Sequence, residues 1–295
     1  MADKQTPSID VLIENSRTLG YVMDRSLATA IYLLVQLGKP LLIEGHAGVG
    51  KTEAAKVLAS FLGTELIRLQ CYEGLDVNSA VYEWNYQKQL LAIKLQEGSN
   101  RELRDLEAHI FGPDFLLQRP LLKSISDKEK SPVLLVDEID RADEAFEAFL
   151  LEVLGEFQIS IPELGTIKAT RPPCVILTSN GARELSDALK RRCLYHWIDY
   201  PSFDKEMDIV RARLPGIGMD LGAQVVSFLH SLRKMSLSKI PGVAETLDLS
   251  KALMLLDKTN LDTETADWTI GCVIKSADDL TKVREEGLDK LLASR

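Results

Sequence analysis

The sequence predicts an α/β domain followed by a smaller helical domain. Short unbroken apolar runs, which are typical of strands buried on both faces of a parallel sheet, alternate with helical patterns along the first part of the chain. After Pro201-Ser202, helical patterns continue without such runs. We therefore expect an α/β domain at residues 1–200 and a helical domain at residues 201–295.

The individual elements follow from local patterns. Apolar residues such as Leu27, Ile31 and Leu34 recur at helical spacing in the expected helices, whereas the expected strands are unbroken apolar runs such as Val133–Val136. In chain order we expect helix 22–37, strand 41–43, a helix ending near Leu62, strand 65–70, helix 101–125 in two pieces split at Gly112-Pro113, strand 133–136, helix 142–154, a hairpin at 157–168, strand 174–178, a short helix before strand 194–198, and helices 204–213, 219–235, 246–257 and 275–292.

Two segments read as insertions on this framework. The segment 71–98 is long, rich in aromatic residues and poorly periodic, and it looks like an insertion on the α/β framework. Residues 157–168 alternate weakly around Pro162 and Gly165, which predicts a β-hairpin. Both segments interrupt the alternation of strands and helices.

Charge and composition narrow the function classes. The chain has 35 Lys and Arg against 44 Asp and Glu, a net charge of -9, which argues against a general binder of nucleic-acid phosphates. No run of 18 apolar residues is present, and the polar start MADKQTPSID lacks the apolar stretch of a signal peptide. The four cysteines and four histidines are scattered, which disfavours disulfides and a zinc site. We expect a cytoplasmic protein without a transmembrane segment.

A glycine-rich segment, Gly45–Thr52, fits the pattern G-x-x-x-x-G-K-[ST] between a strand and a helix. Glycines let backbone N–H groups curve around a β-phosphate, and the helix presents its positive end to the anion. Lys51 can reach the β- and γ-phosphate oxygens, and the Thr52 hydroxyl can ligate Mg²⁺. The pattern predicts a site for ATP and Mg²⁺ whose residues are Gly45, His46, Ala47, Gly48, Val49, Gly50, Lys51, Thr52 and Glu53.

Two acids follow the apolar run Val133–Val136. A strand of a parallel sheet delivers its carboxyl end to the ligand crevice, so Asp137 would hold Mg²⁺ together with Thr52. Glu138 would polarise the attacking water, which makes the reaction hydrolysis rather than transfer to a hydroxyl. A strand that ends in solvated acids looks the same in isolation, and the pairing with the phosphate loop favours the catalytic interpretation.

Further catalytic candidates follow later in the chain. Asn180 lies just after the expected strand 174–178, where an amide can hydrogen-bond the attacking water, although an ordinary turn before Gly181 has the same appearance. Arg191 and Arg192 end a short helix. An arginine there can stabilise phosphoryl charge in a neighbouring subunit, and a solvated helix end is the alternative. The pattern does not choose between the two arginines.

These segments together resemble the AAA+ ATPase superfamily. Walker A (Gly45–Thr52), Walker B (Val133–Glu138), sensor-1 (Asn180) and an arginine-finger segment (Arg191-Arg192) come in that family's order, and a helical lid follows. The two insertions are similar to those of the MoxR branch. Segments that look like its CoxD-type subgroup are Gly20-Tyr21-Val22, Arg119-Pro120-Leu121-Leu122, Glu138-Ile139-Asp140-Arg141-Ala142-Asp143 and Pro241-Gly242-Val243-Ala244-Glu245-Thr246-Leu247-Asp248.

The resemblance implies an AAA+ P-loop core, with a parallel sheet flanked by helices, and a C-terminal helical lid. It implies that Tyr21 and Val22 flank the adenine. MoxR-type proteins resemble one another in function: they act as hexameric chaperones that help to mature metalloenzymes. They usually work with a partner that carries a von Willebrand factor A domain. CoxD-type members resemble assembly factors for the molybdenum- and copper-containing carbon monoxide dehydrogenase. A homo-hexamer, a client of the molybdenum hydroxylase type and peripheral membrane association through partners are thereby implied.

The chain departs from the family pattern in the expected lid. Many AAA+ lids carry a sensor-2 arginine, and residues 242–247 contain none. A carboxylate beside a γ-phosphate would repel it, so we expect Glu245 to point elsewhere. Arg141, just past Walker B, is a candidate for charge supplied in trans or for a surface ion pair. The aromatic side chains of the first insertion either face a client or pack on their own domain; they are Tyr72, Tyr82, Trp84 and Tyr86.

Other functions remain compatible with the same motifs. A DNA-associated AAA+ ATPase would show salt-dependent binding to duplex DNA, which the negative charge disfavours. A P-loop kinase of a small molecule would transfer phosphate without releasing it. A nucleotide-binding structural protein would turn over weakly, as the lack of a sensor-2 arginine allows.

Overall fold

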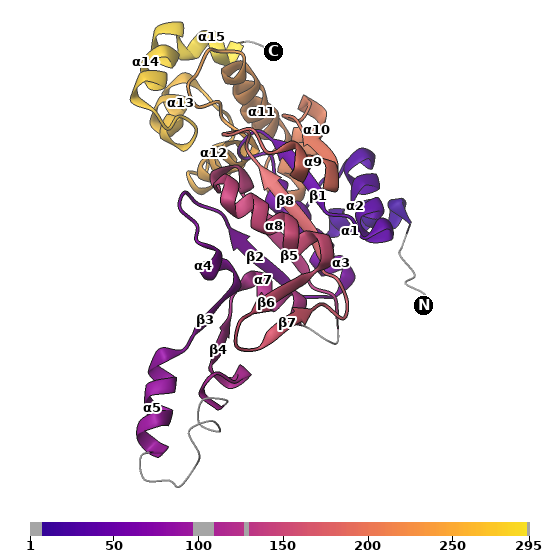
Figure 1. The fold of residues 1–295 in the computed structure, drawn as a ribbon. Coiled ribbons are helices and arrows are strands. Elements are labelled where there is room, and N and C mark those ends of the chain that lie inside the picture. The colour runs from indigo at the N-terminus through magenta and orange to yellow at the C-terminus, as the bar shows by residue number, and fades with distance from the viewer. Residues whose placement is uncertain (1–7, 97–108, 127–129, 294–295) are drawn as a thin grey trace. The chain divides into compact units, whose positions relative to one another are not determined.

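A computed structural model describes residues 8–96, 109–126 and 130–293 of the chain. The described residues form a five-stranded parallel sheet in the order β2-β5-β8-β1-β9, two small antiparallel pairs and helices that flank the sheet or follow it (Figure 1). The predicted α/β class with a helical C-terminal region is thereby confirmed. Within the described ranges, no helix combines the length and the apolar character needed to cross a membrane.

The strands match the predicted apolar runs closely. The sheet consists of β1 (Leu41–Gly45), β2 (Leu66–Gln70), β5 (Val133–Asp137), β8 (Cys174–Ser179) and β9 (Leu194–Ile198). The small pairs are β3 (Tyr82–Trp84) with β4 (Leu116–Gln118), and β6 (Gln158–Ile161) with β7 (Gly165–Lys168). The second pair confirms the predicted hairpin.

Helices occupy most of the remaining described chain. The helices up to β9 are α1 (Ile9–Thr18), α2 (Arg25–Leu37), α3 (Lys51–Leu62), α4 (Val77–Val81), α5 (Tyr86–Gln96), η1 (Pro113–Phe115), α7 (Pro120–Ser126), η2 (Ile139–Arg141), α8 (Glu144–Glu156) and α9 (Asp187–Arg192). The later helices are α10 (Phe203–Arg213), α11 (Met219–Arg233), α12 (Val243–Leu255), α13 (Thr263–Thr269), η3 (Ile270–Cys272), α14 (Ala277–Glu286) and α15 (Leu288–Ala293).

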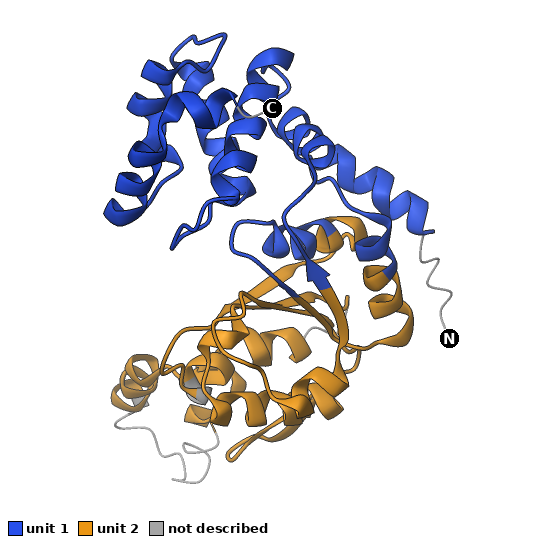
Figure 2. Cartoon of the chain, turned by 90° about the horizontal axis from the view of Figure 1, so that it is seen from above, with its two compact units in different colours: residues 1–29, 44–57, 197–295 blue, residues 30–43, 58–196 orange. Residues whose placement is uncertain are grey.

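The chain divides into two compact units, shown in different colours in Figure 2. Unit 1 comprises residues 1–29, 44–57 and 197–295, and unit 2 comprises residues 30–43 and 58–196. Strands β1 and β9 each pass from one unit to the other. The division into domains at residue 200 stays a prediction, and each unit is described by itself below.

The centre of unit 2 is β5, whose five residues are all buried. Parallel neighbours flank it, with β2 paired so that Gln70 lies opposite Asp137 and β8 paired so that Cys174 lies opposite Val133. Burial on both faces explains why these strands are unbroken apolar runs rather than alternating ones. The register also sets which polar side chains meet at the carboxyl end of β5.

One predicted helix is wrong in part. Residues 116–118, expected to be helical, form β4, and the helix begins only at Pro120. Strand β4 pairs with Tyr82–Trp84, and the backbone N–H of Asn85 donates to the carbonyl of Phe115 at 2.8 Å. A partner strand distant in sequence therefore overrides the local helical pattern. Residues 101–108 of the expected helix lie outside the described residues.

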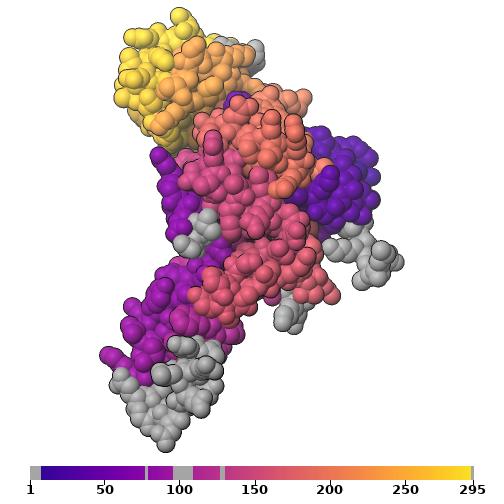
Figure 3. Space-filling view, in the orientation of Figure 1, coloured from indigo at the N-terminus to yellow at the C-terminus, as the bar shows by residue number. Residues whose placement is uncertain are grey.

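The first insertion is a folded arm of unit 2. The described part of residues 71–98 forms α4, β3 and α5, and it stands out from the rest of the unit in Figures 1 and 3. Trp84 is buried in the core of unit 2, and Tyr82 packs against that core. Tyr72 and Tyr86 are exposed, so the aromatic side chains divide between packing and surface.

Unit 1 holds the helices that follow β9. Their core includes Phe228, Leu229 and Leu253, as the predicted helical patterns require. The expected helix 275–292 is two helices, α14 and α15, because Gly287 at φ +91° ends the first. The expected helix 246–257 begins earlier, at Val243, where the Glu245 carboxylate accepts a hydrogen bond from the Gly242 N–H at 2.8 Å and caps the first turn.

A buried ion pair organises unit 1 beside this helix. The Glu206 carboxylate is fully buried and accepts from Arg233 Nη1 at 2.6 Å and Nη2 at 2.7 Å. His230 Nε2 lies 2.9 Å from the same carboxylate, and Arg233 Nε donates to the Pro241 carbonyl at 2.8 Å. The pair therefore tethers the segment that leads into α12.

Candidate functional site

The phosphate loop of unit 1 depends on three glycines. Gly45 has φ +156°, and a Cβ built there would lie 2.1 Å from the Ile198 carbonyl oxygen, so a side chain has no room. Gly48 and Gly50 have φ +75° and +93°, which L side chains rarely adopt. Helix α3 begins at Lys51, and the first N–H groups of a helix have no partner within it. This cradle fits a phosphate group.

Lys51 is held against the loop that it is expected to serve. Its side chain is buried, and Nζ donates to the carbonyls of Gly45 and His46 at 2.6 Å each. Thr52 follows in the first turn of α3. Both side chains therefore lie in the phosphate loop and its helix, where the sequence predicts a nucleotide and Mg²⁺ site.

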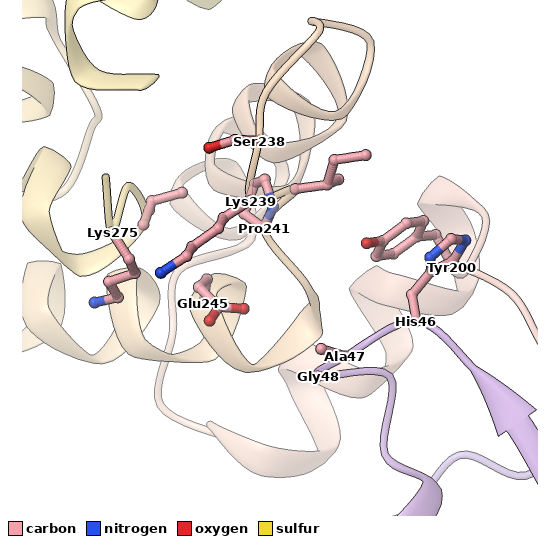
Figure 4. A pocket seen from close by; sticks show the side chains of 11 residues that line it. His46, Ala47, Gly48, Tyr200, Ser238, Lys239, Pro241, Glu245 and Lys275 are labelled. Carbon is pink, nitrogen blue, oxygen red and sulfur yellow. The ribbon is translucent and has the colours of Figure 1, made fainter. Parts of the chain in front are cut away.

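An aromatic clamp that sequence reasoning missed holds the second residue of the loop. The His46 ring stacks on Tyr200 with centroids 4.4 Å apart and planes 7° apart (Figure 4). It also meets the Trp197 ring edge-on, with centroids 5.6 Å apart. The Arg233 guanidinium lies 5.0 Å from the centre of the Tyr200 ring. Burial raises the pKa of Tyr200 against the opposing effect of that charge. The sequence does contain a signal for this cluster, because Trp197 lies near the end of β9 and Tyr200 follows shortly after that strand.

The loop before α2 approaches the phosphate loop from another side. A Cβ on Gly50 would lie 3.4 Å from the Tyr21 ring. Burial, with help from the Asp24 and Glu53 charges, raises the pKa of Tyr21, so its phenol stays protonated. Partial burial opposes ionisation of Glu53, but hydrogen bonds from Lys56 and Arg213 outweigh it and lower the pKa of Glu53. The adenine contacts of Tyr21 and Val22 stay predictions.

The start of α12 touches the phosphate loop directly. The Ala244 N–H donates to the Gly48 carbonyl at 3.3 Å, and a Cβ on Gly242 would lie 2.6 Å from the Ala47 carbonyl oxygen. Glu245, which caps α12, also lines a cavity of about 440 Å³ next to the loop (Figure 4). Its lining includes His46, Gly48, Tyr200, Lys239, Glu245 and Lys275. Among the described residues that line this cavity, the cations of the helical part are Lys239 and Lys275.

In unit 2, Asp137 ends β5 as a buried carboxylate. Its Oδ1 accepts from the Thr178 hydroxyl at 2.5 Å, and its Oδ2 accepts from Arg68 Nε at 2.9 Å. Its backbone carbonyl accepts from the Cys71 N–H at 2.8 Å. Burial, followed by the nearby Asp137 charge, raises the pKa of the Cys71 thiol to about 12. A buried carboxylate at a strand end suits a divalent cation with oxygen ligands.

Glu138 turns out of the strand in a left-handed conformation, with φ 55° and ψ 50°. Two side chains donate hydrogen bonds to its carboxylate, Asn180 Nδ2 to Oε1 at 3.3 Å and Gln70 Nε2 to Oε2 at 3.2 Å. Arg141 Nε forms an ion pair with Oε2 at 2.8 Å. Two predicted residues, Glu138 and Asn180, thus meet directly. Arg141 forms an ion pair within its own chain.

Asp140 was missed by sequence reasoning. Its carboxylate is buried and accepts from the backbone N–H groups of Asn180 at 3.2 Å and Ala182 at 2.9 Å. It therefore fixes the loop after β8 and places the Asn180 amide. Arg68 and Gln70 were missed as well, because they lie on β2 and reach the acids only through strand pairing.

The two candidate finger residues differ in their surroundings. Arg192 Nη1 donates to the Leu151 carbonyl of α8 at 2.6 Å. Arg191 is exposed, and within the described residues it has no hydrogen-bond or ion-pair partner. The assignment of either residue as an arginine finger stays a prediction.

A family model decides the broader assignment. The model of the AAA domain, dynein-related subfamily, matches residues 40–193, more than half of the chain. The chain belongs to this AAA family. Membership implies nucleotide binding by the phosphate loop and indicates a nucleotide-hydrolysing enzyme.

This AAA protein is similar to two staphylococcal proteins and to solved RuvB structures. An uncharacterised protein of Staphylococcus haemolyticus is 26% identical over 72% of this chain and 75% of its own length, and one of Staphylococcus aureus is 27% identical over 69% and 72%. A RuvB variant structure from Thermotoga maritima has 17% identity and a TM-score of 0.50, covering 90% of this chain and 72% of that one. The variant with the TM-score of 0.50 shows the fold. The RuvB Holliday junction branch migration motor of that organism is 16% identical over 89% of this chain and 66% of its own length, with a TM-score of 0.45.

Replacing Gly242 by Ala tests the contact between α12 and the phosphate loop. Because the new Cβ would lie 2.6 Å from the Ala47 carbonyl, the loop must shift, and we expect nucleotide affinity to fall at least about fivefold in a fluorescent-nucleotide titration. Gly218→Ala is the matched control, since Gly218 is also a helix N-cap and a Cβ there meets nothing within 4 Å. Equal affinity in the two variants would show that the contact does not shape the loop.

Proposed function

We propose that this AAA protein hydrolyses ATP and uses the energy to remodel a protein client. The observation that carries the proposal is the direct hydrogen bond between Asn180 and Glu138, beside the buried Asp137. A carboxylate and an amide placed together at the end of a strand can orient and polarise a water. The strand order adds support, because only β8 separates β5 from β1, which leads into the phosphate loop.

Each residue has a distinct task in this proposal. Lys51 and the loop N–H groups hold the phosphates, while Thr52 and Asp137 hold the Mg²⁺ that offsets phosphate charge. Glu138 accepts a proton from the attacking water, and Asn180 fixes the direction of the carboxylate. We propose hydrolysis rather than transfer, because the Glu138 carboxylate can polarise a water as the attacking group.

The donors around Glu138 describe a resting arrangement. Gln70 and Asn180 donate hydrogen bonds to its two oxygens and Arg141 forms an ion pair with one of them, so these partners take up most of the roughly four acceptor positions of the carboxylate. We expect a water to bind the carboxylate more readily when one of these partners is withdrawn. The ion pair with Arg141 is the strongest of the three by charge and distance.

The proposed role in the cell rests on the resemblance to MoxR-type and CoxD-type chaperones. We propose a homo-hexamer that works in the cytoplasm with a von Willebrand factor A partner and matures a molybdenum- and copper-containing carbon monoxide dehydrogenase. Support comes from the arm of unit 2, where Tyr72 and Tyr86 are exposed. The α5 helix of the same arm also exposes Leu90, Leu91 and Leu95. Apolar surface of this kind suits a protein client more than a nucleic acid.

The Walker residues are tested by two substitutions. Glu138→Gln removes the proton acceptor but keeps the shape, so we expect ATP binding within about twofold of wild type and a turnover lower by about 10²- to 10⁴-fold. Lys51→Ala removes the charge that faces the phosphates, and nucleotide affinity should fall about 10- to 100-fold. Binding by calorimetry and phosphate release measure the two effects. Substantial turnover by Glu138→Gln would remove Glu138 as the water activator.

The trans arginine is tested by mixing subunits. Arg191→Ala should bind ATP yet lose hydrolysis, while Arg192→Ala serves as the matched control from the same helix end. When Arg191→Ala subunits are mixed with Glu138→Gln subunits, we expect some phosphate release to return. At a mixed interface, one subunit supplies an intact Glu138 and the other supplies an intact Arg191. Failure to recover activity in verified mixed oligomers would contradict action in trans.

The client assignment is tested by trapping. The Glu138→Gln variant with ATP should retain partner proteins that wild type releases, as detected by mass spectrometry after affinity capture. We expect a von Willebrand factor A protein and a molybdenum hydroxylase, and their absence would remove the carbon monoxide dehydrogenase role while leaving the ATPase proposal intact. Salt-dependent binding to duplex DNA would instead favour a DNA-associated function.

A further inference from the structure

An arginine already occupies the carboxylate that is expected to hold the metal. Arg68 Nε lies 2.9 Å and Nη2 2.5 Å from the same oxygen, Oδ2, of Asp137. The other oxygen, Oδ1, accepts from the Thr178 hydroxyl at 2.5 Å. Both oxygens are therefore engaged within unit 2, and the guanidinium offsets the charge of the acid.

The two members of this pair have very different surroundings. The Asp137 side chain is 4% exposed, whereas the Arg68 side chain is 53% exposed. A carboxylate so deeply buried needs a compensating charge, because leaving it unpaired is costly. The half-exposed arginine can exchange the acid for water, provided that another cation takes its place at Asp137. The acid is fixed, and its partner is exchangeable.

Arg68 also has a second partner that does not depend on Asp137. Its Nη2 donates to Gln70 Oε1, which lies two residues along β2 and so on the same side of the strand. The guanidinium can therefore swing away from the acid and keep a hydrogen bond. The Arg68 guanidinium and a Mg²⁺ ion disfavour each other's binding at Asp137 Oδ2, because like charges repel at such distances.

We propose that Arg68 is a built-in cation that neutralises Asp137 in the resting protein and is displaced when Mg²⁺ loads. The inference rests on the proposed role of Asp137 as metal-holding residue. Arg68 acts through Asp137 and is a positioning residue. Its presence keeps the buried acid compensated before loading, and it lowers the metal affinity of the site through competition.

Metal affinity measured on the full chain tests the proposal. With ADP bound, Mn²⁺ titrations followed by electron paramagnetic resonance should show Arg68→Gln binding the ion about tenfold more tightly than wild type. Arg119→Gln is the matched control, because it removes an arginine from an exposed ion pair with Glu83 elsewhere in unit 2 and should leave Mn²⁺ affinity unchanged. Unchanged or weaker Mn²⁺ binding by Arg68→Gln would overturn the competition.

A second measurement covers the case in which Arg68→Gln does not fold. In wild type, the Nε–H nuclear magnetic resonance signal of Arg68, assigned with Arg68→Lys, should shift on addition of Mg²⁺ to the ADP complex and stay in place with ADP and EDTA. If the Arg68 signal does not shift when Mg²⁺ is added, the proposal that Mg²⁺ displaces Arg68 is wrong. Asp137→Asn separates the two proposals: wild-type Mn²⁺ affinity in that variant would refute the metal role of Asp137 itself, whereas loss of affinity there with no effect at Arg68 would refute the competition alone.

Discussion

Burying carboxylates is the constraint that organises both units. Five carboxylates are buried, and an unpaired buried charge is strongly destabilising; they belong to Asp137, Asp140, Glu147, Glu206 and Asp279. Each of them accepts from arginine, hydroxyl or backbone N–H donors brought from elsewhere in its unit. The polar contacts around β5 and around α12 therefore meet the same requirement, which is to compensate the charge of a buried carboxylate.

The contacts that compensate these buried charges also position the functional groups. Asp140 compensates its charge with backbone N–H groups of the loop after β8, and that loop carries the Asn180 amide to Glu138. Glu206 compensates its charge with Arg233, which in turn binds the Pro241 carbonyl just before Gly242. In the helical part, the Asp279 carboxylate accepts from Ser238, which is the first cause of its pKa falling to about 2. A structural need for charge compensation thus sets loop geometry.

The parts of the fold that sequence reasoning reached are those governed by local patterns. Unbroken apolar runs such as Val133–Val136 predicted buried strands because burial on both faces leaves no alternation, and Gly45–Thr52 predicted the phosphate loop because backbone geometry demands glycine there. Strand 116–118 escaped because its pairing with β3 is not local. Arg68 escaped for the same reason, since only the register of β2 on β5 brings it to Asp137. The spacing of a motif contains no information about the side chains that other strands supply to it.

The close approach of Gly48 and Gly242 has a consequence for how such chains can diverge. A Cβ on Gly48 would lie 3.3 Å from the Gly242 Cα, and a Cβ on Gly242 would lie 3.0 Å from the Gly48 Cα. The two positions therefore share one small volume, although 194 positions apart in sequence number. Side-chain size at one site limits what the other can accept, so exchanging the helical part of this chain for that of a distant relative requires matching both positions. The phosphate loop and the helical part can therefore pack together because both positions are glycine.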